Sequence, residues 1–157
     1  MRLRPVYAIL IVLVLVAGGV AANYAYQTGL HGVRFTRVTP DASGMVHINV
    51  ADLGPKQVRF YRFLNAGNQE VKFLVARDGS GALQVAFDAN DKCYRYGRGF
   101  HPQGDWVVCN KCEISTRLDQ INEGHGGCSP IPLAFKADGD AIVVAQNDIL
   151  KGWRLFN

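Results

Sequence analysis

A long apolar run at the N-terminus divides the chain into two parts before any other pattern is considered. No charged residue occurs from Pro5 to Leu30, and the stretch from Val6 to Ala22 is almost wholly aliphatic. Because a helix that crosses a membrane needs about 20 apolar residues, we predict a transmembrane anchor over residues 5–26. The rest of the 157-residue chain is long enough for one further domain with its own core.

The charges on either side of this run predict its orientation. Arg2 and Arg4 precede the run directly, whereas the next basic residue is Arg34. Basic residues favour the cytoplasmic side of a membrane, so residues 1–4 are predicted to be a cytoplasmic tail. This makes the chain a single-pass protein of the inner or plasma membrane, with its domain in the periplasm or outside the cell. A cleaved signal peptide is the alternative, since residues 20–25 include small side chains near a possible cleavage point.

Most of the remaining sequence alternates apolar and polar residues, which is typical of strands with one buried face. Such alternation occurs at residues 45–50, 57–64, 70–76 and 82–87. The connectors at residues 65–68 and 77–81 are rich in Asn, Asp and Gly, which favour turns. We therefore predict a three-stranded antiparallel meander over residues 57–87.

The C-terminal part repeats the hairpin signal once and then changes its pattern. Residues 137–140, Ala-Asp-Gly-Asp, separate two short apolar segments at 133–136 and 141–145. Asn147 is predicted to cap a short final helix from residue 148 to about residue 152. The predicted fold class is therefore mainly β, of the β-rich α+β type. It has an N-terminal transmembrane helix, a linker and first strand at 27–44, and one extracytoplasmic antiparallel-sheet domain at 45–157 with a glycine-rich cysteine-loop region.

All four cysteines lie within one short stretch of that domain, which predicts one local site rather than a frame for the whole fold. The pair Cys109 and Cys112 is separated by two residues, so both sulfurs can face one centre from a tight turn. Glycine-rich loops flank the outer two cysteines. We predict a metal-binding region over residues 88–133. Its candidate ligands are Cys93, Cys109, Cys112 and Cys128, with His101 and His125 as possible additions.

The residues alone leave several chemistries open for these thiols. They could hold an iron–sulfur or other redox metal centre or a structural zinc ion, and in an oxidising compartment they could form two disulfides. A thiol–disulfide active site at Cys109 and Cys112 is a further alternative, whereas covalent haem is disfavoured because Glu113 follows Cys112 in place of a histidine. We find no candidate catalytic residue, so a stand-alone enzyme is less expected than an electron-transfer or metal-binding protein. The net charge of +4 is modest and scattered, which argues against nucleic-acid binding.

Three stretches of the sequence resemble the FtrD-like membrane iron–sulfur proteins. They are VAFD at residues 85–88, GDWVVCNKC at 104–112 and GGCSPIPL at 126–133. The resemblance extends over about residues 45–145. It implies an iron–sulfur cluster on the cysteines and electron transfer associated with bacterial iron uptake, with a membrane permease or redox protein as partner.

One position departs from the family pattern. Asn90 stands where the family usually has the first cysteine of an additional CxxC, so that only Cys93 of that pair is present. The alternatives to the family function are a zinc- or disulfide-stabilised interaction module and a metallochaperone for a metal transporter. The protein would then carry zinc or no resident cofactor.

Overall fold

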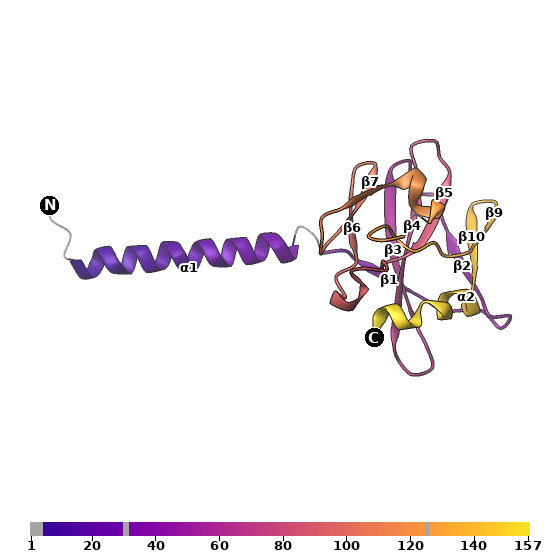
Figure 1. Ribbon diagram of the computed structural model, residues 1–157, viewed down its shortest axis with the longest axis horizontal. Coiled ribbons are helices and arrows are strands. Elements are labelled where there is room, and N and C mark those ends of the chain that lie inside the picture. The colour runs from indigo at the N-terminus through magenta and orange to yellow at the C-terminus, as the bar shows by residue number, and fades with distance from the viewer. Residues whose placement is uncertain (1–4, 30–31, 125) are drawn as a thin grey trace. The chain divides into compact units, whose positions relative to one another are not determined.

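The computed structural model describes residues 5–29, 32–124 and 126–157, and it consists of two units divided after Gly32 (Figure 1). The first unit contains helix α1, Pro5–Gly29. Over the residues described, no helix combines the length and the apolar character that crossing a membrane requires. The predicted transmembrane anchor over residues 5–26 is therefore not supported, although a helix does cover these positions.

The second unit, Val33–Asn157, is built from three small sheets. The largest contains β1 (Phe35–Val38), β3 (Gln57–Leu64), β4 (Glu70–Arg77) and β5 (Leu83–Phe87), in that order. The second has the order β2 (Met45–Asn49), β10 (Ala141–Ala145) and β9 (Lys136–Asp138). The third has the order β6 (Phe100–Gln103), β7 (Trp106–Cys109) and β8 (Ser115–Arg117).

The mainly β prediction is confirmed, but the sheets are less uniform than expected. The meander of β3, β4 and β5 is antiparallel throughout, as predicted. Its second turn is closed by Asp78, whose Oδ1 accepts hydrogen bonds from the N–H groups of Ser80 and Ala82. By contrast, β1 pairs with β3 in parallel, because β2 intervenes in sequence and joins another sheet.

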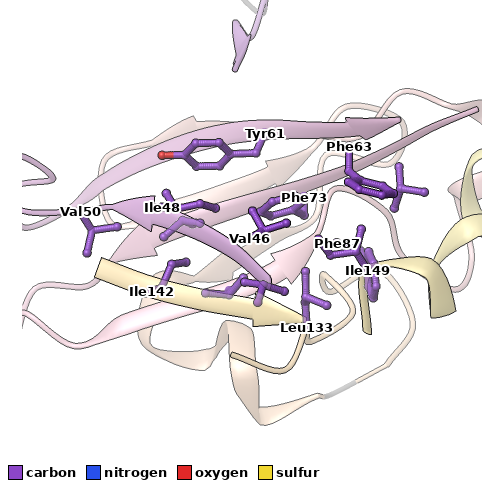
Figure 2. Close-up of a cluster of buried hydrophobic side chains, with 14 of the residues drawn as sticks. Val46, Ile48, Val50, Tyr61, Phe63, Phe73, Phe87, Leu133, Ile142 and Ile149 are labelled. Atoms are coloured by element: carbon purple, nitrogen blue, oxygen red, sulfur yellow. The ribbon is translucent and has the colours of Figure 1, made fainter. Parts of the chain in front are cut away.

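The central sheet is covered on both faces, and this explains the burial of β4. On one face Tyr61, Phe73 and Phe87 pack against Ile48 and Ile142 of the β2–β10–β9 sheet (Figure 2). On the other face a second core forms between the central sheet and the β6–β7–β8 sheet; its members include Phe60, Leu74, Ala76, Ala86, Phe100, Val107 and Cys109. The expectation that these strands are buried on one face only is therefore wrong for β4, since the third sheet covers its other side.

The C-terminal segment differs in detail from its prediction. The hairpin of β9 and β10 is present, but Leu133 lies outside it and pairs with β5 instead, donating its N–H to Val85 O at 2.9 Å. Helix α2 spans Gln146–Lys151, and Ala145 occupies the N-cap position without a side-chain hydrogen bond. The predicted cap by Asn147 is therefore wrong, because the helix begins directly where β10 ends. A 3-10 turn, η3 (Trp153–Phe156), closes the chain.

Candidate metal centre

Three segments that are distant in sequence bring the cysteines together. Cys93 lies between β5 and the 3-10 turn η1 (Tyr94–Tyr96). Cys109 ends β7, and Cys112 lies in the turn that follows it. Cys128 lies in the loop that follows a second 3-10 helix, η2 (Leu118–Glu123). The site is therefore assembled by tertiary packing rather than by one continuous motif.

The loop that carries Cys128 is fixed along the edge of the central sheet. Ile131 O accepts the N–H of Phe87 at 2.8 Å, and Leu133 donates to Val85. The residues before Ile131 and before Leu133 are both prolines, at positions 130 and 132. Proline has no N–H to donate, so it fits edge positions at which no backbone hydrogen bond is donated. A further backbone hydrogen bond from Lys92 to Gly127 ties this loop to the residue next to Cys93. These contacts explain why the Cys-x-Pro-Ile-Pro-Leu sequence places a thiol beside β5.

The turn between Cys109 and Cys112 is held by its own backbone. Cys109 donates its N–H to Ile114 O at 3.0 Å and accepts at its carbonyl from Glu113 N at 2.9 Å. Glu113 adopts a positive φ of 59° to close the turn. Cys109 is 1% exposed and belongs to the second core, whereas Cys112 is half-buried at its edge. The pair therefore has one sulfur in the protein interior and one nearer to solvent.

The four thiols converge, three of them in one compact group. The Sγ atoms of Cys93, Cys112 and Cys128 all lie within 4.8 Å of one another. The Cys112 and Cys109 thiols are also close enough to Cys93 to raise the pKa of its thiol. All four cysteines are free thiols, so the alternative of two disulfides is not what the structure contains.

Asn90 connects two of these cysteines, a role that sequence reasoning missed. Its side chain is 2% exposed. The amide Nδ2 donates to Cys109 Sγ at 3.3 Å, while Oδ1 accepts the backbone N–H of Cys93 at 2.6 Å. The only sequence signal at this position was the expectation that the family pattern has a cysteine where this chain has Asn90. In the structure the amide acts as a hydrogen-bonded support for the thiols rather than as an additional thiol.

The Cys93 thiol does not ionise easily without a cation. The pKa of the Cys93 thiol is raised to about 12, first by desolvation and then by its contacts with the Cys112 and Cys109 thiols. Thiolates are the form that binds metals, so a cation that enters the group releases protons. A bound metal ion therefore supplies the positive charge that stabilises the thiolates, which the site lacks on its own.

A buried carboxylic acid lies close to the thiols. Asp88 is 7% exposed and accepts the N–H of Phe100 at Oδ1, at 2.7 Å. Burial raises the pKa of Asp88 to about 7, while the Phe100 hydrogen bond and the charge of Lys72 oppose the shift. Together with Cys93 and Cys109 it lines a hollow at this side of the domain. Its contact with Phe100 fixes the start of β6 against the end of β5.

His101, one of the two candidate histidine ligands, is not part of the thiol group. Among the described residues, the cluster that could hold a metal contains cysteines alone. His101 is engaged elsewhere, with its Nδ1 at 2.6 Å from Asn110 Oδ1. His125 lies outside the described residues.

The donor set fits thiolate-bound iron or zinc. Four thiols are the usual complement of structural zinc sites and of iron–sulfur clusters. A single tetrahedral ion with metal–sulfur bonds of about 2.3 Å holds its sulfurs about 3.8 Å apart, which three sulfurs within 4.8 Å approach closely. In a cluster of several irons the thiolates do not all bind the same iron atom, so some of them would lie farther apart. To hold such a cluster, the loops of Cys93, Cys112 and Cys128 have to move apart.

Comparison with known proteins gives a family match over most of the chain. The model of the family described as membrane iron-sulfur containing protein FtrD-like matches residues 53–156. No curated protein matches the sequence. Among solved structures, the quaternary ammonium Rieske monooxygenase CntA in complex with substrate gamma-butyrobetaine is similar, at 9% identity and a TM-score of 0.41. The similarity covers 77% of this chain but 35% of that one, and at this TM-score it carries no argument.

Proposed function

Because the chain belongs to the family of FtrD-like membrane iron–sulfur proteins, we propose that it transfers electrons through an iron–sulfur centre held by its four cysteines. The observation that carries the proposal is the convergence of Cys93, Cys112 and Cys128, with Sγ atoms within 4.8 Å of one another. Cys109 completes the set through its contact with Cys93. Thiolate-bound iron supplies reversible one-electron chemistry.

In this function the protein's residues hold and tune the centre without being chemically changed. One electron enters from a reduced donor protein, and one electron leaves to an oxidised acceptor, so the chain is unchanged over a cycle. Cys109 and Asn90 form the interior side, where burial and a hydrogen bond to sulfur set the reduction potential. Cys93, Cys112 and Cys128 are half-buried and form the side nearer to solvent, where electrons can be exchanged.

The biological setting that we propose is iron uptake at a membrane. The resemblance of the cysteine segments implies iron uptake, with a membrane permease or a redox protein as partner. We also propose that the chain is held at a membrane, with its cysteine-bearing unit outside the cytoplasm, on the basis of the family description and the position of Arg2 and Arg4. Carbonate extraction of membranes, with a periplasmic reporter fused to the C-terminus, tests this placement. A soluble or cytoplasmic reporter would contradict it.

The experiment for the centre itself is anaerobic purification of the full chain after supplementation with iron and sulfide. We expect bound iron and a visible absorption band that bleaches on one-electron reduction. Cys112→Ser and Cys128→Ser should each lose most of the iron, whereas Ser129→Ala, which removes a neighbouring hydroxyl but no thiol, should keep it. A colourless protein that shows no reduction wave after this treatment would disprove the proposal. Assay of acid-labile sulfide distinguishes a cluster from a single iron.

A structural zinc site is the second candidate, and one observation favours it. The spacing of the three sulfurs is closer to that around one tetrahedral ion than to that around a cluster. This function predicts about one tightly bound zinc for each chain. It also predicts no redox activity at the site, so that oxidised and reduced samples do not differ. Metal analysis of the protein as isolated from its native host separates the two candidates.

A further inference from the structure

The positive charges of the domain are neutralised unevenly. Five exposed cations away from the cysteines are paired with carboxylates, in the pairs Lys56–Asp105, Arg59–Asp52, Arg62–Glu70, Arg117–Asp119 and Lys151–Asp148. Others, such as Arg37 and Lys136, are exposed without such a pair among the described residues. Three further exposed cations line the hollows beside Cys93, and within the described part of the chain no carboxylate pairs with them. They are Arg95, Arg98 and Lys111, and we refer to them as the basic rim.

The basic rim borders the opening onto the thiols. Arg98 and Lys111 line the same hollow as Cys93 and Cys109. Arg95 lines the adjoining hollow, and Tyr94 and Lys72 are common to both. The positive charges therefore lie on the approach to Cys93, the one cysteine of the solvent-facing side that lines this hollow.

Few negative charges offset the rim at this place. The carboxylates that line the two hollows are Glu70, which pairs with Arg62, and Asp88, which is buried. Asp91 and Glu113 belong to the same stretch of sequence, but neither lines a hollow. The surface next to the thiols is thus a region of net positive charge, which concentrates negatively charged partners.

Two of the three cations are held on aromatic rings. Lys111 Nζ lies 4.4 Å from the centre of the Tyr96 ring, and the Arg95 guanidinium lies 5.8 Å from the centre of the Tyr94 ring. Tyr96 is 59% exposed although it is a large aromatic residue. Tyrosine and arginine are the residue types that protein interfaces favour. Cations that are already ordered in this way lose less freedom when a partner binds.

We propose that the basic rim is the docking surface for an acidic protein that exchanges electrons with the cysteine centre. The identity of the partner as an electron carrier rests on the function proposed above, whereas its negative charge follows from the rim alone. Guanidinium groups match carboxylates in a planar, bidentate geometry. A small charged patch also suits the weak and short-lived complexes that electron-transfer proteins form. An anionic membrane is the rival occupant, but it would cover the opening through which electrons must pass.

The first experiment measures how strongly the positive charge of the basic rim attracts an anionic reagent to the thiols. The full chain is reduced, freed of metal and held in a neutral detergent. Its cysteines then react with dianionic 5,5′-dithiobis(2-nitrobenzoate) or, in a parallel sample, with neutral 4,4′-dithiodipyridine. A change in thiol ionisation affects both rates equally, so it cancels in the ratio of the two rates. The double variant Arg98→Glu/Lys111→Glu should lower the anionic-to-neutral ratio by about tenfold at low salt, and this difference should shrink at high salt.

A matched control carries the same change of charge elsewhere. Arg37→Glu/Lys136→Glu alters two exposed cations that line neither hollow, and it should keep the wild-type ratio. If the rim variant keeps that ratio too, or if the control lowers it equally, the proposal is wrong. The assay needs no bound metal, so it gives a result even when the iron centre proves absent and the proposed function fails.

The second experiment identifies what covers the rim. Poly-L-glutamate serves as the probe for an acidic protein surface, and phosphatidylserine vesicles serve as the probe for an anionic membrane. We expect poly-L-glutamate to slow the reaction of the thiols with neutral 4,4′-dithiodipyridine severalfold in the wild type and in the control, but not in the rim variant. Protection by the vesicles alone, or equal protection of the rim variant, would overturn the proposal.

Discussion

The buried carboxyl of Asp88 provides the sharpest quantitative prediction about the fold. It follows β5, it is 7% exposed, and its Oδ1 accepts the N–H of Phe100. Burial raises its pKa from 3.8 to about 7 in the folded protein. The native state therefore holds this proton more tightly than the unfolded chain does.

The sign of the pH dependence follows from this difference. Between the unfolded pKa of 3.8 and the folded value of about 7, the native state binds more protons than the unfolded state, so the free energy of unfolding falls as the pH rises. About three pKa units correspond to an upper limit of about 4 kcal/mol between pH 4 and pH 8. Below pH 4 both states are protonated, and the contribution of Asp88 to this slope vanishes.

The substitution Asp88→Asn isolates the contribution of this one group. Asparagine keeps an oxygen that can accept the Phe100 N–H, but it does not titrate. The assay is urea unfolding of the reduced, metal-free full chain at several pH values, followed by tryptophan fluorescence. Wild type should lose roughly 2–3 kcal/mol more than the variant between pH 5 and pH 8. Groups other than residue 88 are the same in both proteins, so their contribution cancels in the comparison.

A neighbouring carboxylate serves as the control. Asp91→Asn removes an exposed acidic group from the same loop, and it should leave the wild-type slope unchanged. At pH 5, where Asp88 is protonated, Asp88→Asn should unfold within about 1 kcal/mol of wild type. Parallel curves for wild type and Asp88→Asn over the whole range would show that the carboxyl does not carry a buried proton.

Three further predictions concern close contacts near the site. Gly99→Ala should cost about 2–4 kcal/mol in urea unfolding, because Gly99 has a φ of 59° and a Cβ there would overlap the Asp88 carboxylate. Gly152→Ala should cost a similar amount, since its Cβ would overlap the Phe87 ring at the C-terminal end of the core. A wild-type midpoint of urea unfolding for either variant would contradict the close approach at that glycine. Asn90→Ala should lower the affinity for Co²⁺, read from its thiolate absorption, by about 10–100-fold, because it removes both hydrogen bonds of the side chain; an unchanged affinity would exclude this supporting role.

The parts of the fold that could be predicted from sequence are those that local patterns determine. The meander over residues 57–87 combines alternation within each strand with turns of Asn, Asp and Gly, and the structure confirms it. The tight turn expected between Cys109 and Cys112 is likewise present, directly after the strand Trp106–Cys109. In these segments neighbouring residues suffice, because both the strand and its turn are specified within a few positions.

The third sheet and the docked loop could not be predicted, because their partners are far away in sequence. β6 contains Pro102 and has no clear alternation, and its role in covering Leu74 and Ala86 becomes visible only when the chain is folded. The loop of Cys128 depends on hydrogen bonds to β5, some forty residues earlier. The cations of the basic rim are likewise dispersed in sequence. Only the folded structure shows which cations form an ion pair with a carboxylate and which do not.

The two sides of the cysteine site differ in a way that suits an electron carrier. On the inner side, Cys109 belongs to the core beneath the central sheet, and the buried amide of Asn90 is hydrogen-bonded to its sulfur. On the outer side, Cys93, Cys112 and Cys128 are half-buried in loops, and Cys93 lines the hollow that Arg98 and Lys111 also line. If the proposed function holds, the interior side would set the potential and the basic rim would select the partner, so substitutions on one side should leave the property governed by the other intact.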